Sequence, residues 1–245
     1  MKLVLSFDDG RGDSYNGFQT LRRHNLVASF HVVTQFIEKT KKYEGFGDPL
    51  SVEQLIEMKN FGCEISSHGD NHIMEINDFK TSFAKLNKWG LCGISCGFSV
   101  PNSDYDEGNL ILFENEEKCS YIRLGRSPKC YSFRSKLYYL LYHITKFQLF
   151  YNLFNRHNVL NCAMGSRLYS VVVKRDVRVR NIIRFLKKYE KTSFIIILMF
   201  HSVSNHCKDC WSYSTKKFET LCDYLEKSSI EVTTLRDLMN DKNKI

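Results

Sequence analysis

The 245-residue sequence has few prolines and no long apolar run. Its three prolines are scattered and no segment is rich in proline or serine, which argues against an extended linker between domains. No run of eighteen apolar residues occurs, so no membrane-spanning segment is predicted. Only three apolar residues separate Lys2 from Ser6, and no small-residue cleavage site follows. We therefore recognise no signal peptide and expect a cytoplasmic protein.

Cysteine is present, but not in the pattern of a disulfide-stabilised secreted protein. The nine cysteines are odd in number and scattered, so we interpret them as reduced thiols. The pattern His206-Cys207-x-x-Cys210 has ligand types suited to a second metal, but no second C-x-x-C accompanies it. Reduced loop thiols are the preferred interpretation there, and a second metal is the alternative.

The chain also lacks the composition of a disordered protein and the motifs of nucleic-acid-binding proteins. Hydrophobic residues make up 43% of the sequence, enough for a core. The net charge of +8 favours anionic glycans, phosphate-bearing substrates or an anionic membrane surface as partners. No helix-turn-helix, zinc-finger or RNA-binding signature accompanies this charge, so we expect no nucleic-acid partner.

The first ten residues, MKLVLSFDDG, contain the most informative pattern in the sequence. A short apolar run predicts a buried strand, which ends at Asp8 and Asp9. Neighbouring side chains in a strand point to opposite faces, so two acids can serve one pocket only where the chain turns, as Gly10 permits. Adjacent carboxylates repel each other unless a cation neutralises them. The pattern therefore predicts a metal, with one acid as ligand and the other as base.

Strands and helices alternate along the rest of the chain, which predicts an α/β fold with a mostly parallel sheet. Seven such units indicate a distorted (β/α) barrel, which we assign to one domain spanning residues 1–245. The predicted strands are 3–7, 26–33, 63–67, 93–100, 120–124, 167–173 and 194–200, with a last short strand at 230–233. The predicted helices are 14–24, 51–61, 79–89, 135–154, 177–190, 218–225 and 235–239, and 107–117 is ambiguous.

Chemically informative residues follow several of these strands. Active sites of such barrels gather at the carboxyl ends of the strands. His68 and His72 are four residues apart, so a helical turn after the third strand would place both imidazoles on one face. Together with the Asp8-Asp9 pair they form a two-histidine, one-carboxylate set that suits zinc, or cobalt, nickel or manganese. His31, inside the second strand, is interpreted as a core histidine rather than a ligand.

Four segments occur in an order and at spacings that resemble the polysaccharide deacetylase family, the NodB-homology domains of carbohydrate esterase family four. They are SFDDG, SSHGDNH, FSVP and LMFHS. The resemblance implies a NodB-type barrel and metal-assisted removal of N-acetyl groups from an amino sugar or glycan precursor. It implies Asp8 as general base, Asp9, His68 and His72 as metal ligands, and His201 as general acid.

The sequence departs from the family pattern at two places. The family's third motif has an arginine two residues before the proline, oriented toward the catalytic Asp, and here Ser99 occupies that position. The fourth motif, an Asp that orients the acid histidine, has no clear match, and Asp176 is the nearest candidate. In the segment 107–164 we recognise no family motif. The Ser99 departure predicts a differently tuned base or weak activity.

Three further residues are candidates for binding the substrate. Pro101 and Asn102 follow the fourth strand, and the resemblance implies that a backbone N–H near Asn102 stabilises the oxyanion. Trp211 lies in a loop after His201 and is the better of two tryptophans for stacking on a sugar ring.

The aromatic-rich segment at about 130–160 is predicted to be a helix, or a helical pair, inserted between strands. The preferred interpretation is that it covers the barrel. The alternative is an interfacial surface, aided by Arg134, Lys146 and Arg156, that meets a membrane carrying a lipid-linked sugar. A lipid-linked or nucleotide-linked substrate and a location at the inner membrane face remain open at this point.

Two other functions are weighed against N-deacetylation of a sugar. One is deacylation of a non-sugar amide, and the other is a catalytically silent domain that binds a glycan or a partner. The intact Asp8, Asp9, His68, His72 and His201 argue against silence, whereas Ser99 argues mildly for it.

Overall fold

The computed structural model describes residues 1–161, 165–206 and 209–242. Its strands form a nine-stranded sheet in which all paired neighbours are parallel, in the order β6-β5-β4-β3-β2-β1-β8-β7, with β11 also paired to β1. The strands are β1 (Lys2–Phe7), β2 (Ser29–Val32), β3 (Glu64–Ser67), β4 (Cys96–Ser99), β5 (Cys119–Leu124), β6 (Arg167–Tyr169), β7 (Val171–Val172), β8 (Ile195–Phe200) and β11 (Glu231–Thr233).

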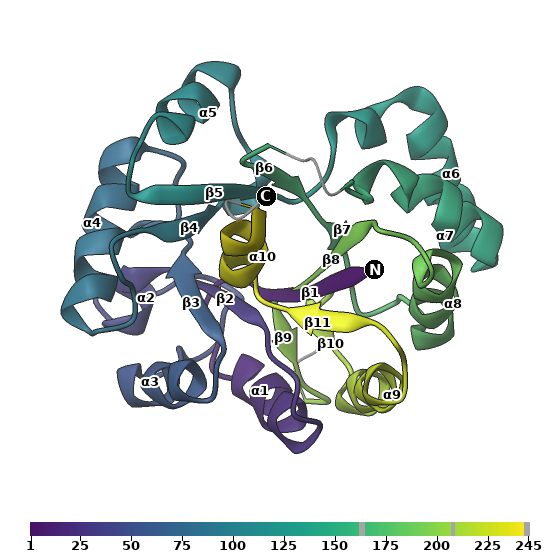
Figure 1. Cartoon of the computed structure of the whole chain (residues 1–245), viewed down its shortest axis with the longest axis horizontal. Helices are drawn as coiled ribbons and strands as arrows, with labels where there is room; N and C mark the ends of the chain where they lie inside the picture. Colours follow the sequence, from purple (N-terminus) through teal and green to yellow (C-terminus); the bar gives the residue numbers. More distant parts are fainter. Residues whose placement is uncertain (162–164, 207–208, 243–245) are drawn as a thin grey trace.

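The sheet curls into a nearly closed barrel, as Figure 1 shows. The two ends of the strand order, β6 and β7, are separated in the chain by Ser170 alone. The segment 167–173, predicted as a single strand, therefore pairs with β5 through its first part and with β8 through its second. The predicted distorted parallel barrel is confirmed, and β9 (Ser202–Val203) and β10 (Ser212–Tyr213) form a small separate sheet that the sequence did not predict.

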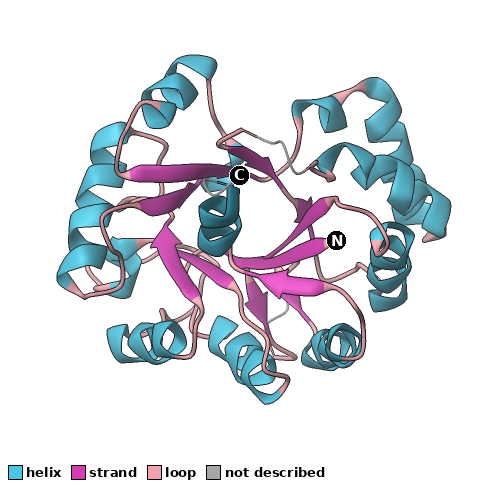
Figure 2. Cartoon of the chain, viewed as in Figure 1, coloured by secondary structure: helices cyan, strands magenta, loops and turns pink. Residues whose placement is uncertain are grey.

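Except for the last one in the chain, the helices surround the barrel on its outside (Figure 2). In α3 the side chain of Ser51 accepts a hydrogen bond from the backbone N–H of Gln54, whose side chain accepts one from Ser51 in return; this capping box explains where the helix begins. The helices are α1 (Ser14–Arg23), α2 (Thr34–Ile37), α3 (Val52–Asn60), α4 (Ile76–Lys88), α5 (Glu107–Glu114), α6 (Phe133–Thr145), α7 (Gln148–Asn155), α8 (Val179–Tyr189), α9 (Thr215–Glu226) and α10 (Leu235–Lys242).

Strand β1 shows how the side-chain alternation of a strand divides the core. Leu3, Leu5 and Phe7 belong to the large cluster that includes the buried faces of the surrounding helices. Val4 belongs to a smaller cluster together with Leu235 and other residues of the barrel and of α10. Helix α10 lies across the middle of the barrel in Figure 1. The same alternation directs Ser6 and then Asp8 toward the barrel interior, which positions the candidate site.

The aromatic segment folds as the predicted helical pair, α6 and α7. Helix α7 buries Tyr151 and Phe154, but α6 leaves an apolar stripe exposed. The stripe consists of Phe133, Leu137, Leu140 and Ile144, whose spacing of three and four residues places them on one helical face.

The seven cysteines that the structure describes are all free thiols. Cys162 and Cys207 lie outside the described residues, so the pattern His206-Cys207-x-x-Cys210 is only partly seen. In the described part of the chain, no helix combines the length and apolarity needed to cross a bilayer.

Candidate metal centre and active site

The turn after β1 brings both adjacent carboxylates to one pocket. Asp8 continues the β1–β8 pairing, because its N–H donates to the carbonyl of Phe200 at 3.0 Å. Asp9 then adopts φ +74° and Gly10 φ +81°, which breaks the strand alternation. A Cβ on Gly10 would lie 2.9 Å from the Ile37 side chain and in a strained backbone conformation, so only glycine fits this turn.

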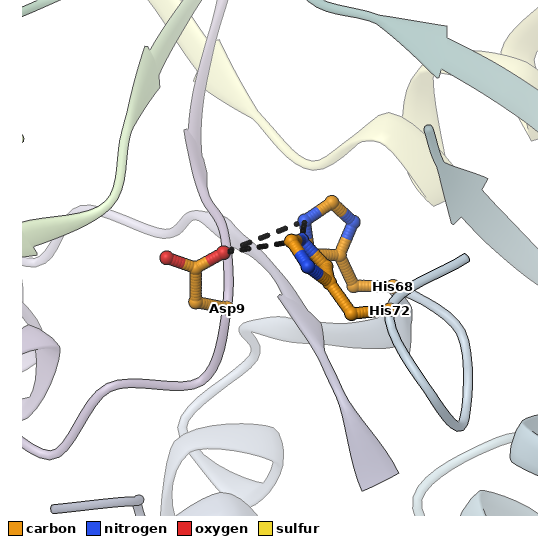
Figure 3. A group of neighbouring side chains, drawn as sticks. All are labelled: Asp9, His68 and His72. Carbon is orange, nitrogen blue, oxygen red and sulfur yellow. Dashed lines mark hydrogen bonds and ion pairs between the residues drawn. The ribbon is translucent and has the colours of Figure 1, made fainter. Parts of the chain in front are cut away.

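Asp9, His68 and His72 gather into a set of three possible metal ligands, drawn in Figure 3. The Asp9 Oδ1 atom lies 3.5 Å from His68 Nε2 and 3.8 Å from His72 Nε2. The two Nε2 atoms are 3.2 Å apart. His68 Nδ1 lies 2.8 Å from the carbonyl oxygen of Ser99, so it carries the proton and leaves Nε2 free to bind an ion. Two imidazoles and one carboxylate are a donor set that fits a divalent first-row metal.

A loop, rather than the expected helical turn, brings His68 and His72 together. Gly69 has φ +85° and His72 has φ +61°, neither of which a right-handed helical turn allows. The Asp78 carboxylate instead holds the loop by accepting the backbone N–H groups of Asp70 at 2.8 Å and of Asn71 at 2.9 Å. The predicted pairing of the histidines stands, but the local conformation predicted for it was wrong.

Arg11 fixes the orientation of the Asp9 carboxylate. Its Nε donates to Asp9 Oδ2 at 2.8 Å, which leaves Oδ1 facing the histidines. A second nitrogen of Arg11 donates to Asp209 at 2.6 Å. Burial alone would raise the pKa of Asp9, but His201, His68 and Arg11 outweigh burial and lower it. Asp9 is thus an anion, as a metal ligand must be.

His72 is suited to bind as a neutral ligand. Burial, together with the neighbouring His68, lowers the pKa of His72 to about 4. A neutral imidazole offers the lone pair that a metal needs.

Asp8 is held by an arginine from a neighbouring strand. Arg123 of β5, which is 1% exposed, donates from one nitrogen to both Asp8 Oδ1 and Ser99 Oγ. Burial would raise the pKa of Asp8, but Arg123 and the nearby histidines outweigh burial and lower it to about 2. The arginine that the family pattern has at the position of Ser99 is therefore absent there, and the Arg123 guanidinium from the paired strand reaches Asp8 instead.

His201 follows β8 and faces the same pocket. Its Nδ1 is buried and makes no hydrogen bond within the described residues. The ring packs against Trp211 with centroids 4.4 Å apart. Burial lowers the pKa of His201, against the opposing effect of Asp9 and Asp8. Asp176, the nearest candidate for the orienting acid, pairs instead with Lys146 at 2.6 Å and with His143 at 3.1 Å.

The five residues of the predicted machinery line one cavity of about 250 Å³. Of the three predicted substrate contacts, Asn102 and Trp211 line it too, whereas Pro101 is buried and borders an adjoining pocket together with Asn102. Asn102 and Ser103 have φ values of +54° and +55°. His31 lies in the core, as predicted, with ring nitrogens 3.3 Å from Ser6 Oγ and 3.0 Å from the Tyr121 hydroxyl.

Four cationic residues in or beside this pocket were not predicted from the sequence. Arg11 directly follows the DDG motif, and that adjacency was the available signal. Arg123 could be found only from the β4–β5 register, which pairs it with Ser99. Arg126 and Lys174 also line the pocket, and no sequence spacing links them to the motifs.

Comparison with known proteins supports the resemblance. Residues 1–86 match the family model for polysaccharide deacetylase. A family 4 acetyl xylan esterase from Clostridium thermocellum, in complex with a cobalt ion, superposes with a TM-score of 0.57 and 15% identity, over 99% of this chain and 92% of that one. A peptidoglycan N-acetylglucosamine deacetylase, Bc1960, has a TM-score of 0.55 and 13% identity, over 97% of this chain and 87% of that one.

One similar structure is of a protein without the activity. BA3943 of Bacillus anthracis, a CE4 family pseudoenzyme, has a TM-score of 0.56 and 11% identity, over 97% of this chain and 65% of that one. No curated protein matches the chain. Identities this low show a shared fold. The match over residues 1–86 and this shared fold together confirm the resemblance to the polysaccharide deacetylase family.

Proposed function

We propose that the protein is a metal-dependent hydrolase that removes the N-acetyl group from an amino sugar of a glycan or glycan precursor. The observation that carries the proposal is the convergence of Asp9, His68 and His72 with Asp8 and His201 in one cavity. The polysaccharide deacetylase resemblance over residues 1–86 supports the same chemistry.

One divalent ion, zinc in our proposal with cobalt, nickel or manganese as alternatives, would be held by Asp9, His68 and His72. When bound, it supplies a Lewis acid for the acetamide carbonyl and lowers the pKa of water from ~15.7 to ~7. Arg11 already orients the Asp9 carboxylate, so Asp9 would lose little side-chain freedom when the ion binds.

Asp8 and His201 provide the two proton transfers that amide hydrolysis needs. Because its pKa is lowered to about 2, Asp8 is ionised at neutral pH and can accept the proton of the attacking water. His201 donates a proton to the departing amine as the carbon–nitrogen bond breaks, which yields acetate and the free amino sugar.

The remaining wall of the cavity positions the sugar. Trp211 offers an aromatic face beside His201, and sugars stack on such faces. Asn102, in its left-handed conformation at the end of β4, is the position from which we propose a backbone N–H toward the oxyanion.

Acetate release from N-acetylated sugars, measured alongside metal content, tests this function. We expect about one equivalent of divalent ion, metal-dependent acetate release, and loss of both in the double variant His68→Ala/His72→Ala. Asp8→Asn should retain the metal and lose about 10²-fold or more in rate. His157→Ala, outside the cavity, is the matched control. A wild type that binds no supplied divalent ion would refute the proposal.

A glycan-binding domain without catalysis is the second candidate, because one similar structure is that of a pseudoenzyme. It predicts that the metal-loaded protein binds N-acetylated glycans but releases no acetate from them. Deacylation of a non-sugar amide is distinguished in the same assay by supplying simple N-acetyl amides.

We also propose that the protein acts in the cytoplasm at the inner membrane face, on a lipid-linked or nucleotide-linked sugar. The exposed stripe on α6 supports the membrane contact in this proposal, because Phe133 is 84% and Ile144 71% exposed and basic residues lie on the same helix. Co-sedimentation with liposomes should depend on anionic lipid and be lost in Leu140→Glu/Ile144→Glu. Ile94→Glu, at a site 95% exposed outside α6, is the control. No binding at low salt would refute the membrane contact.

A further inference from the structure

Two cationic side chains line the cavity of the candidate metal centre without an acidic partner among the described residues. Arg126 follows β5 and Lys174 follows β7, and both line the cavity that holds Asp9 and His201. Among residues 1–161, 165–206 and 209–242, no carboxylate forms an ion pair with either of them. Arg126 also has a buried Nε that finds no hydrogen-bond partner in the described part of the chain.

The acidic groups in and beside the cavity are already paired with other cations. Asp8 pairs with Arg123, and Asp9 pairs with Arg11. Arg11 also pairs with Asp209. Asp176, which borders the neighbouring pocket with Arg126 and Lys174, is bound to Lys146 and His143. Among the described residues, no carboxylate therefore neutralises the partly buried charges of Arg126 and Lys174. An anionic ligand could bind them without displacing a protein carboxylate.

Aromatic rings hold both cations in position. The Arg126 guanidinium carbon lies 4.9 Å from the ring centroid of Phe154 and 5.3 Å from that of Tyr139. Lys174 Nζ lies 4.2 Å from the centroid of Trp211, the ring that packs against His201. Lys174 thus places its charge next to the residue that protonates the leaving amine.

The location of the two cations also defines where an anion would lie. Arg126, Val172 and Lys174 line both the metal cavity and an adjoining aromatic pocket that includes Tyr139, Tyr151 and Phe154 of α6 and α7. A group bound by the two cations would therefore lie at the boundary between the metal centre and the helical pair. An arginine fork with a lysine ammonium is the donor set that phosphate and carboxylate prefer.

We propose that Arg126 and Lys174 bind an anionic group, phosphate or carboxylate, on the substrate, so that the enzyme takes an anionic amino sugar. The inference rests on the proposed deacetylase function, since it assigns the substrate class of the same cavity. An anionic substrate group would neutralise the charges of Arg126 and Lys174. The proposal also gives the inserted helices α6 and α7 a role, because the Phe154 ring of α7 holds Arg126 in position.

Binding to the inactive, metal-loaded Asp8→Asn protein tests the site without requiring turnover. The probes are N-acetylglucosamine, N-acetylglucosamine 1-phosphate, its uridine diphosphate derivative, and N-acetylmuramic acid as the carboxylate. We expect the phosphate or carboxylate form to bind about tenfold or more tightly than the neutral sugar, with an advantage that shrinks as salt rises. The anion that gains most distinguishes a sugar phosphate, a nucleotide sugar and an acidic sugar.

Substitutions then locate the effect. In the Asp8→Asn background, Arg126→Gln and Lys174→Gln should each reduce the anionic-to-neutral affinity ratio about tenfold, and Lys174→Glu should invert it. Arg126→Lys should restore part of the ratio. Lys187→Gln is the matched control, because Lys187 also lies over an aromatic ring, that of Tyr224 at 5.5 Å, but outside the cavity.

The outcomes separate the two proposals. An anion preference that depends on Arg126 and Lys174 supports the anion site even if the active enzyme releases no acetate, in which case the deacetylase function fails. Metal-dependent deacetylation of neutral sugars, with no anion preference and no effect of these substitutions on the affinity ratio, would overturn the anion site while the deacetylase stands.

Discussion

Arg123 shows that a side chain can be supplied by the neighbouring strand. Ser99 and Arg123 are paired in the β4–β5 register, and both side chains are buried. Paired residues of adjacent strands point to the same face, so an arginine at either position can reach Asp8. The small Ser99 leaves the space that the guanidinium of Arg123 occupies, and its hydroxyl accepts a hydrogen bond from it.

A swap of these two residues tests that interpretation. Arg123→Ser should lower the rate of acetate release about 100-fold or more, because Asp8 loses its orienting cation. Ser99→Arg in the Arg123→Ser background should recover part of that loss. Initial rates at matched metal content provide the measurement, and circular dichroism verifies folding. A double variant no more active than Arg123→Ser would contradict the interchangeability of the two positions.

The residues predicted from the sequence lie in short motifs, whereas those found only in the structure reach the site through tertiary contacts. Asp8, Asp9, His68, His72 and His201 lie in short conspicuous segments, and the strand ends predict that they meet. Arg123 reaches the site through strand pairing, and Lys174 through packing against Trp211. Neither relation leaves a spacing in the sequence.

At the scale of the elements, a buried carboxylate joins the barrel to its last helix. Glu64 of β3 is 0% exposed and accepts hydrogen bonds from Ser29, Ser66 and Tyr121. It also accepts the backbone N–H of Arg236 in the first turn of α10 at 2.9 Å. A negative charge at a helix N-terminus stabilises that helix. Glu64 therefore caps α10 from inside the barrel.

Glu64→Ala should be strongly destabilising. It removes the acceptor shared by Ser29, Ser66, Tyr121 and the Arg236 N–H, which we expect to cost about 3 kcal/mol or more. Urea unfolding measures the change, and faster hydrogen exchange in α10 would locate it. Glu231→Ala, which removes only the exposed ion pair with Lys2, is the control and should cost less than about 1 kcal/mol. Equal losses in the two variants would contradict the cap.

Helices α1 and α9 are joined by His24, a histidine whose pKa is raised by two glutamates. Burial lowers the pKa of His24, but hydrogen bonds to Glu226 and Glu219 outweigh burial and raise it above its ordinary value of 6.5. A raised folded-state pKa means that protonated His24 stabilises the fold below the ordinary value. This contribution is lost as the pH rises through the raised value.

Replacing His24 should therefore reduce the pH dependence of stability. Between about pH 5 and about pH 9, the free energy of unfolding of His24→Gln should fall less than that of the wild type. The difference should stay below about 1 kcal/mol, because the partner carboxylates are exposed and screened. His157→Gln is the control, because burial and Arg156 lower the pKa of His157 instead of raising it. Identical pH profiles for His24→Gln and the wild type would contradict the role of His24.

The elements themselves were largely predictable from apolar patterns and helix caps. The ambiguous segment 107–117 contains α5, whose N-cap Asp106 accepts the backbone N–H of Asn109 at 2.9 Å. The division of 167–173 at Ser170 was not predicted, because the apolar pattern continues on both sides of this residue. The cause lies in tertiary structure, since the buried Ser170 hydroxyl donates to carbonyls of Leu124 and Gly125.

On the scale of the whole molecule, the candidate metal ligands lie at the rim and not in the core. Both core clusters consist of apolar residues that make no use of an ion. Removing the metal should therefore abolish activity and leave the fold intact. Circular dichroism after chelation is expected to match the loaded protein.

Restoring the metal should raise the melting temperature by mass action. An ion at 100 times its Kd adds about 2.7 kcal/mol, which corresponds to roughly 5–10 °C for a chain of this size. Differential scanning fluorimetry measures the shift, and His68→Ala/His72→Ala should show none. Unfolding on chelation would contradict a structurally independent barrel.

The pairing of β1 has a consequence for how the protein is made. β1 lies beside β8 along its whole length and beside β11 at Lys2–Val4, and both neighbours come late in the chain. On the ribosome, the first strand and the aspartates after it emerge long before these neighbours are synthesised. The pocket around Asp8 and Asp9 can therefore close only after β8 and β11 have been synthesised, so the nascent chain stays inactive until then.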